Sequence, residues 1–151
     1  MKEYEYSKKV DNLDKYIDYC EINGFVLKEK IKQIRTIYRK NDSTIARITI
    51  NENNGVIKRE LDFKEDKLSD EELIVRKESL SLEFDDEKSV LSILDFLNYK
   101  QDNTLERIRY IYEKDDIKFE FDEYIKPERC NVVSLEGNKE KADKIWLEIK
   151  K

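Results

Sequence analysis

Apolar and charged residues alternate strictly along several stretches of this chain. Residues 117–123 alternate isoleucine or phenylalanine with lysine, glutamate and aspartate, which predicts a strand with one apolar and one charged face. Residues 45–50 repeat the pattern with Arg47 and Thr49 on the polar face, and residues 3–6 alternate acids with tyrosines. A charged strand face normally meets water, but several acidic and basic faces together would also suit the interior of one polar barrel.

Three other stretches carry apolar residues at helical spacing, around residues 13–20, 90–97 and 142–149. Gly24 follows the first as a stop signal, and the acids at 85–87 suit the start of the second. Polar turns at 40–43, 52–55 and 113–116 favour hairpins and therefore antiparallel strands. The strand-like runs lie at about 2–9, 27–39, 43–52, 55–63, 71–84, 104–113, 116–123 and 129–136.

This order of elements predicts an α+β fold. About eight antiparallel strands can close into a barrel and so remove the exposed sheet edges. We expect an eight-stranded barrel, closed or nearly closed, with the helices packed outside and the charged strand faces inside. The length of 151 residues fits a single domain over residues 1–151. Residues 64–70 are expected to form a charged loop near a barrel mouth.

The composition narrows the classes of function. Charged residues make up 43% of the chain, yet 30 Lys+Arg nearly balance 35 Asp+Glu. The chain lacks the basic excess typical of a duplex-binding surface, and no apolar run reaches the roughly 18 residues of a membrane span. We therefore expect neither a nucleic-acid nor a membrane partner. The N-terminal residues lack the pattern of a signal peptide, which favours a cytoplasmic protein.

The cysteines and the missing histidines bear on metal chemistry. Cys20 and Cys130 form no metal-ligand cluster and are expected to be reduced, buried thiols. The chain contains no histidine, which excludes histidine-dependent catalysis. A bound metal would therefore rest on carboxylates, which favour hard ions such as Mg²⁺ or Mn²⁺.

An ordered series of short motifs carries a family resemblance over nearly the whole chain. It includes a Glu-x-Glu opening strand, an Arg-x-Arg strand, an Arg-x-Glu strand, a Lys-x-Arg strand and a late Glu-Gly, found here at residues 3–5, 47–49, 76–78, 107–109 and 136–137. At 47–49 the second arginine is Thr49, and at 107–109 the lysine is Arg107. The series resembles the CYTH-domain proteins, members of the triphosphate tunnel metalloenzymes, which include class IV adenylate cyclases, thiamine triphosphatases and inorganic triphosphatases. The chain departs from the family pattern at Ser7, Thr49, Leu80 and Ser134, where the family has charged residues.

The resemblance implies a role for each matching residue. Arginine forks suit phosphate oxygens, and the apolar neighbours of Arg47 and Lys58 predict that both face inward. The implied substrate-binding residues are Arg47, Lys58, Arg76, Arg107 and Arg109. The implied metal ligands are Glu3, Glu5, Asp122 and Glu136, and the implied catalytic residues are Glu3, Glu5, Arg47 and Arg109.

The resulting functional hypothesis is a divalent-metal-dependent phosphohydrolase that acts on an inorganic or nucleoside triphosphate in a charged tunnel. A class IV-type adenylate cyclase is one alternative. A catalytically weakened module that binds a polyphosphate or nucleotide is another, because the four departures remove charged positions. The expected partner is a small molecule that contains a triphosphate, and the expected state is a monomer or homodimer.

Overall fold

The computed structural model describes residues 2–68 and 73–150. The first half contains β1 (Lys2–Val10), α1 (Asp14–Ile22), β2 (Val26–Arg39), β3 (Thr44–Asn53), β4 (Val56–Leu68), β5 (Leu73–Glu78) and β6 (Leu82–Glu83). The second half contains α2 (Glu87–Phe96), β7 (Lys100–Lys114), β8 (Ile117–Lys126), β9 (Cys130–Gly137) and α3 (Lys139–Lys150).

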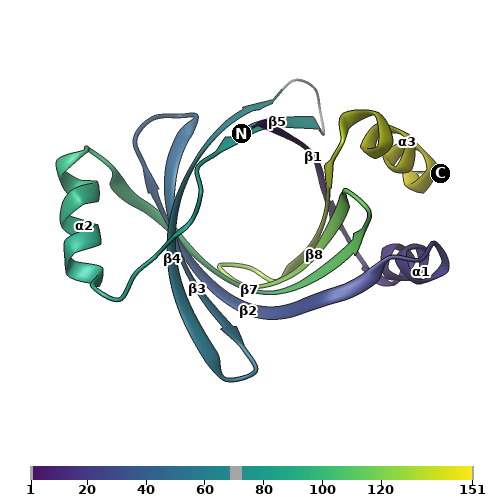
Figure 1. Cartoon of the computed structure of the whole chain (residues 1–151), viewed down its shortest axis with the longest axis horizontal. Helices are drawn as coiled ribbons and strands as arrows, with labels where there is room; N and C mark the ends of the chain where they lie inside the picture. Colours follow the sequence, from purple (N-terminus) through teal and green to yellow (C-terminus); the bar gives the residue numbers. More distant parts are fainter. Residues whose placement is uncertain (1, 69–72, 151) are drawn as a thin grey trace.

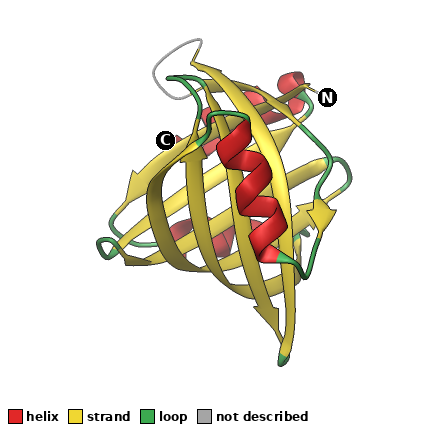
Figure 2. Cartoon of the chain, turned by 90° about the vertical axis from the view of Figure 1, so that its left-hand side faces the viewer, coloured by secondary structure: helices red, strands yellow, loops and turns green. Residues whose placement is uncertain are grey.

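Eight antiparallel strands form a closed barrel. They follow one another in the order β3-β2-β7-β8-β9-β1-β5-β4, and pairing of β3 with β4 closes the ring. The two-residue strand β6 pairs with Glu60 and Leu61 of β4, beyond the part of β4 that pairs with β5. Figure 1 looks along the bore of the barrel, and Figure 2 shows the strands crossing its wall at a tilt. The expected α+β fold with an eight-stranded barrel and external helices is therefore confirmed.

Several predicted boundaries are wrong. The run at 71–84 was expected to be one strand, but β5 ends at Glu78 and β6 has two residues. Residues 64–68 continue β4 instead of starting a loop, because their backbone pairs with β5; residues 69–72 lie outside the described part. β7 begins at Lys100, where polar residues that show no apolar alternation pair with the end of β2. Backbone pairing extends these strands beyond what their side chains indicate.

Two apolar clusters lie between the helices and the outer face of the barrel. Helices α1 and α3 cover one side, where Phe119, Phe121 and Leu135 are fully buried. The ring of Trp146 on α3 stacks on Tyr6 at a centroid distance of 5.2 Å. Helix α2 covers β3 and β4 on the other side (Figure 2). None of the described helices is long and apolar enough to cross a membrane.

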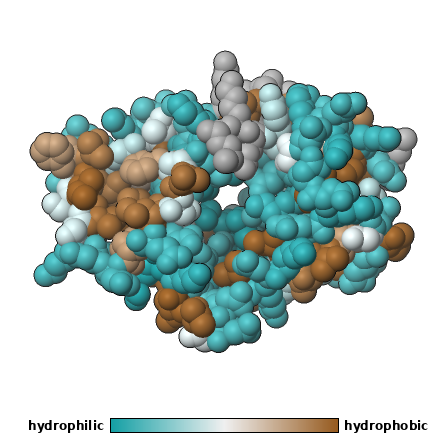
Figure 3. All heavy atoms as spheres, viewed as in Figure 1, coloured by the Kyte–Doolittle hydropathy of each residue, from teal (hydrophilic) through white to brown (hydrophobic). Residues whose placement is uncertain are grey.

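The inner face of the same strands is charged and also buried. On β8, Glu120 is 7% exposed and Asp122 is 1% exposed, while they alternate with the outward-packed phenylalanines. A view along the bore shows an opening at the centre, surrounded mainly by hydrophilic side chains (Figure 3). The charged strand faces thus meet one another inside the barrel, as the alternation predicts.

Candidate functional site

A charged cavity of about 380 Å³ occupies the bore of the barrel. Each of the eight barrel strands contributes at least one side chain to its wall. The cationic side chains of the wall are Arg35, Arg47, Lys64, Arg76, Arg107, Arg109 and Lys118. The acidic ones are Glu5, Asp66, Glu78, Glu120, Asp122 and Glu136, and the remainder are Ser7, Tyr124, Val132 and Ser134. We call this space the charged cavity.

Most residues implied by the resemblance meet in the charged cavity. They are Glu5, Arg47, Arg76, Arg107, Arg109, Asp122 and Glu136. The backbone of Glu3 pairs with Arg76 in the β1–β5 ladder, but its side chain lies outside the described part of the structure. Seven positions on six different strands thus converge because each is an inward-facing strand position.

Lys58 does not line the charged cavity. Its side chain is 58% exposed and lies 3.7 Å from the carboxylate of Glu83, which is 65% exposed. Lys58 pairs with Asn51 near the tip of the β3–β4 hairpin, which extends beyond the ring of strands (Figure 1). The alternation identified the correct face of β4, but the residue lies past the end of the bore. Lys64 and Asp66, further along the same strand, reach the cavity instead.

Ion pairs neutralise two of the arginines on one side of the charged cavity. The guanidinium group of Arg47 donates to Asp62, with 2.9 Å from Nε to Oδ1, and to Glu78 at 2.9 Å. Arg76 donates to Glu5 at 2.8 Å and to Asp66 at 3.0 Å. These ion pairs are largely buried, so their net contribution to stability depends on complete hydrogen bonding of both partners.

The opposite side contains a second ion-pair network, built on β7 and β8. Arg109 forms a bidentate pair with Asp122, at 2.7 and 2.9 Å, and donates to Glu120 at 3.0 Å. Lys118 Nζ lies 2.7 Å from Glu136 and 3.8 Å from Glu120. Burial by itself would raise the pKa of Glu120. The positive charges of Arg109 and Lys118 outweigh burial and hold this pKa at about 2. Glu120 therefore stays ionised inside the barrel.

Three buried carboxylates lie together between these networks. Oxygen atoms of Glu5, Glu120 and Glu136 lie within 4.8 Å of one another. Burial raises the pKa of Glu5 to about 7, Arg76 lowers it, and the charges of Glu120 and Glu136 raise it further. The donor set contains only carboxylate oxygens, which fits a hard divalent cation such as Mg²⁺ or Mn²⁺.

Two guanidinium groups in the charged cavity are incompletely neutralised. Arg107 is 3% exposed; it donates to Gln33 at 2.8 Å and to Tyr124 at 2.7 Å, and its Nη1 atom lies 3.5 Å from Asp122, which already pairs with Arg109. The Nη2 atom of Arg107 has no hydrogen-bond partner among the described residues. Arg35 donates to Thr49 at 2.9 Å and forms no ion pair within the described residues. Burial and the charges of Arg107, Arg47 and Arg109 lower the pKa of Arg35. The unsatisfied donor of Arg107 and the guanidinium group of Arg35, which has no ion pair among the described residues, favour an anion at this part of the wall.

Glu120, Lys118, Lys64 and Arg35 were not predicted as members of the site. The sequence pattern could have identified Glu120 and Lys118, because both lie on the same face of β8 as Asp122. Ser7 and Ser134, which replace charged family positions, lie side by side with 3.2 Å between their hydroxyl oxygens. Glu120 pairs in register with Ser134, so a carboxylate lies next to the position where the resemblance lacks an acid.

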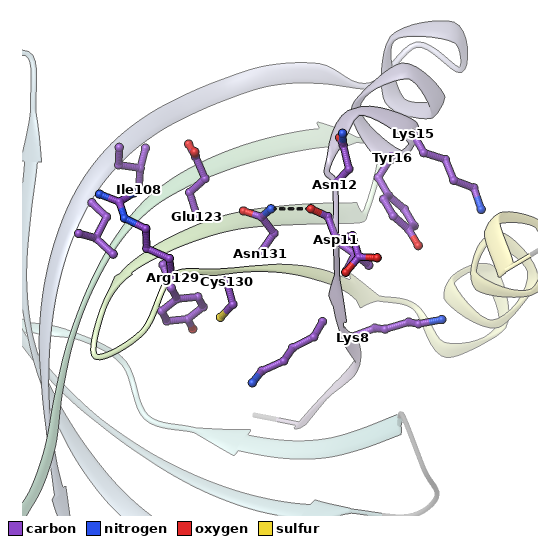
Figure 4. Close-up of a pocket in the computed structure, with 14 residues that line it drawn as sticks. Lys8, Asp11, Asn12, Lys15, Tyr16, Ile108, Glu123, Arg129, Cys130 and Asn131 are labelled. Atoms are coloured by element: carbon purple, nitrogen blue, oxygen red, sulfur yellow. Dashed lines mark hydrogen bonds between the residues drawn. The ribbon is translucent and has the colours of Figure 1, made fainter.

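Other cavities lie outside the charged wall. A groove of about 1150 Å³ lies at the start of α1, with Asn12 and Tyr16 on one side and Glu123 and Arg129 on the other (Figure 4). Its residues show no convergence of carboxylates and arginines. The sulfur of Cys130 also lines this groove, and Cys130 is half-buried, whereas Cys20 is buried as expected. Burial raises the pKa of the Cys20 thiol to about 12.

Comparisons with known proteins support the fold. No protein-family model and no curated protein matches the chain. Among solved structures, the PH1819 protein from Pyrococcus horikoshii OT3 has a TM-score of 0.75 and 19% identity, with 98% of this chain and 88% of that chain covered. A candidate adenylyl cyclase from Hippeastrum, HpAC1, described as having a dominant triphosphatase activity, has a TM-score of 0.67 and 15% identity, with coverages of 97% and 84%.

The same fold also occurs in a protein of a different kind. A chain of the Schizosaccharomyces pombe Mediator head module matches with a TM-score of 0.67 and 10% identity, with coverages of 99% and 93%. These likenesses confirm the tunnel fold that the resemblance to the CYTH-domain proteins implied. Because one barrel hosts such different proteins, the function has to be argued from the charged cavity itself.

Proposed function

We propose that the protein binds a triphosphate together with a divalent cation in the charged cavity and hydrolyses it. The observation that carries the proposal is the buried Nη2 atom of Arg107, which has no partner among the described residues and lies beside the unpaired charge of Arg35. A buried, unsatisfied guanidinium donor is costly unless a ligand completes it. Phosphate oxygens are the acceptors that arginine forks match best.

The charge balance of the cavity favours a cation and an anion bound together. Its wall carries seven cationic and six acidic side chains among the described residues, so it is nearly neutral. A bare triphosphate would add about four negative charges to this nearly neutral space, which is unfavourable in a medium of low dielectric. A divalent cation brought in with the phosphates would reduce this charge and would find its own carboxylates on the wall.

The residues divide this work between them. Glu5, Glu120 and Glu136 would hold Mg²⁺ or Mn²⁺, since their oxygens already lie together. Arg35 and Arg107 would bind phosphate oxygens, while Arg47, Arg76 and Arg109 would add contacts to the ligand with their carboxylate partners holding them in place. The bound cation would supply charge neutralisation and a water of lowered pKa. The protein's own part is positioning and electrostatic stabilisation.

Within this proposal Asp122 has a positioning role. Both of its oxygens accept hydrogen bonds from Arg109, so it fixes that guanidinium group rather than joining the three clustered carboxylates. Arg47 is fixed in the same way by Asp62. A carboxylate that orients an arginine keeps the fork in the direction needed for phosphate.

The test is a screen with tripolyphosphate, ATP and thiamine triphosphate in the presence of Mg²⁺ or Mn²⁺, with detection of both phosphate and cyclic nucleotide. We expect metal-dependent phosphate release. Arg107→Gln should lower triphosphate affinity by about tenfold or more, as for loss of a charge-assisted contact. Arg129→Gln, an exposed change in the outer groove, serves as the matched control.

The outcomes separate the alternatives. Release of a cyclic nucleotide would favour the cyclase. Tight binding without turnover would favour the binding module, for which the uncharged pair Ser7 and Ser134 argues. If the wild type binds none of the three triphosphates in calorimetry, the proposal is wrong.

A further inference from the structure

Helix α2 carries apolar side chains on two of its faces. Val90 and Leu94 are buried against the barrel, as is usual for an amphipathic surface helix. Ile93, Phe96 and Leu97 are 57%, 85% and 41% exposed, and their spacing of i, i+3 and i+4 places them on one helix face. Hydrophobic side chains gather on this side of the molecule (Figure 3). An exposed apolar face of this kind is typical of a contact with another molecule.

The segment that contains α2 is also acidic. Residues 83–96 contain five acids, Glu83, Asp85, Asp86, Glu87 and Asp95, but only one basic residue, Lys88. The carboxylate of Asp95 lies 3.6 Å from Lys100, yet the two side chains are 79% and 74% exposed, so this weak pair leaves both charges accessible. A surface that binds the exposed face of α2 should therefore combine apolar side chains with positive charge.

The outer groove at the start of α1 has this complementary character (Figure 4). Val10, Tyr16, Ile108 and Ile125 supply the apolar part of its wall, and each is buried or half-buried. Among its lining residues, four exposed basic side chains outnumber two acidic ones; they are Lys8, Lys9, Lys15 and Arg129 against Asp11 and Glu123. The groove is thus locally positive on a chain whose formal net charge is −5.

The size of the outer groove suits a protein element. Its volume of about 1150 Å³ lies above the range of roughly 300–1,000 Å³ that is usual for small-molecule sites. Insertion of an apolar helix face into such a groove is a recurring mode of recognition, with anchors at positions i, i+3 and i+4. Ile93, Phe96 and Leu97 have this spacing.

We propose that the outer groove of one molecule receives helix α2 of a second copy of this chain, with Ile93 and Phe96 as the apolar anchors. Helices α1 and α2 lie on opposite sides of the barrel, so a molecule does not fill its own groove and the contact is head-to-tail (Figure 1). A head-to-tail contact can repeat, which gives short chains of molecules rather than a closed dimer. The contact lies outside the bore and is independent of the proposed function.

Charge disfavours the alternative contact, in which α2 packs on α2 of a second copy about a two-fold axis. That arrangement would bring together two segments that each carry five acids and one lysine. Like charges across an interface repel, whereas the outer groove offers the opposite sign. Because salt screens exposed charges, added salt should weaken the head-to-tail contact and strengthen an α2–α2 contact.

Sedimentation velocity tests the contact with two complementary variants. The helix variant is Ile93→Ser combined with Phe96→Ser, and the groove variant is Lys8→Glu combined with Lys15→Glu. The protein concentration should run from about 10 μM to about 1 mM, because one helix face in a groove forms a small and therefore weak interface. All four side chains are exposed, so we expect both variants to keep the wild-type circular dichroism.

Each variant has a matched control. Ile22→Ser removes an apolar side chain that is 83% exposed at the far end of α1. Lys28→Glu combined with Lys30→Glu changes two exposed lysines of β2 and alters the net charge by the same amount as the groove variant. Both controls should associate as the wild type does. Phe96→Ser alone provides a second readout if the helix variant unfolds.

We expect the average mass of the wild type to rise past that of a dimer with concentration, and each variant alone to associate at least tenfold more weakly. An equimolar mixture of the two variants should form dimers that grow no further. The reason is that the intact helix of the groove variant fits the intact groove of the helix variant, while the other two surfaces are blocked.

Three results would overturn the proposal. The first is a wild type that stays monomeric over the whole concentration range. The second is association that is lost in the helix variant but kept in the groove variant, which would indicate an α2–α2 contact. The third is loss of association in both variants without recovery of a dimer in their mixture.

Discussion

The two faces of the barrel wall are built on alternate residues of the same strands, yet they are stabilised in different ways. On β8, Phe119 and Phe121 face the outer helices and are fully buried, while Glu120 and Asp122 face the bore and are almost as inaccessible. The outer face gains free energy from apolar burial and close packing. The inner face gains little from burial, and its charges are tolerated because they are paired.

This difference separates folding from function along one strand. The outer layer is well packed where helices α1, α2 and α3 cover its two apolar clusters. Among the described residues, the inner layer is incomplete at two places. One is Arg35, without an ion pair, beside the unsatisfied Nη2 donor of Arg107, and the other is the crowded carboxylates around Glu5. Natural proteins keep such imbalances mainly where a ligand completes them.

The outer face should show the largest effect on stability. Phe119→Ala removes a fully buried ring that contacts Phe25 and Phe121, and we expect the free energy of unfolding to fall by about 3–5 kcal/mol. Chemical denaturation measures this. Phe96→Ala, at a side chain that is 85% exposed, should change stability by less than about 0.5 kcal/mol. Similar values for the two variants would contradict the assignment of Phe119 to the core.

The crowded carboxylates of the inner face should make the stability of the protein depend on pH. Burial raises the pKa of Glu5 from 4.5 to about 7, so between these values the folded protein holds a proton that the unfolded chain has released. The stability contributed by this group is present below about pH 4.5 and is lost as the pH rises through 7. Relative to Glu5→Gln, the wild type should lose up to about 3 kcal/mol over this range.

Denaturation of both proteins at a series of pH values measures this loss. Glu21→Gln, an exposed change on α1, is the control and should follow the wild type. Parallel curves for wild type and Glu5→Gln between pH 4.5 and 7 would show that Glu5 is not strained by its neighbours in the absence of a ligand.

The alternation in the sequence carried most of the information about which face each residue takes. It placed Arg47 and Asp122 on the inner face, and both line the charged cavity. It carried no information on how far along the bore a residue lies, which is why Lys58 was assigned to the site and Lys64 was not. The stagger of strands in a barrel sets that height, and it depends on pairing between distant segments. The ion-pair partner of each buried charge also depends on which strands lie side by side, so these partners were not predicted.

The anion-binding part of the inner face should respond to loss of Arg35. Arg35→Gln removes a guanidinium group that has no ion pair among the described residues, so we expect little loss of stability but a loss of about 1.5–3 kcal/mol in tripolyphosphate binding. Calorimetry measures both quantities. Arg59→Gln, an exposed change on β4, is the matched control. Unchanged affinity in Arg35→Gln would remove this residue from the site.

The smallest effect on ligand binding is expected at Lys58, which lies on the inner face of β4 but beyond the end of the bore. Lys58 and Lys64 lie on the same face of β4, six residues apart, but Lys58 forms only an exposed pair with Glu83, whereas Lys64 is mostly buried and lies 3.0 Å from Asp66. An exposed pair of this kind is worth about 0–1 kcal/mol. Lys58→Gln should therefore change tripolyphosphate affinity by less than about 0.3 kcal/mol, while Lys64→Gln should weaken it measurably, because only Lys64 brings its charge into the charged cavity. Equal losses in the two variants would mean that the site extends past the ring of strands, and the boundary between the charged cavity and the outer hairpin would have to be redrawn.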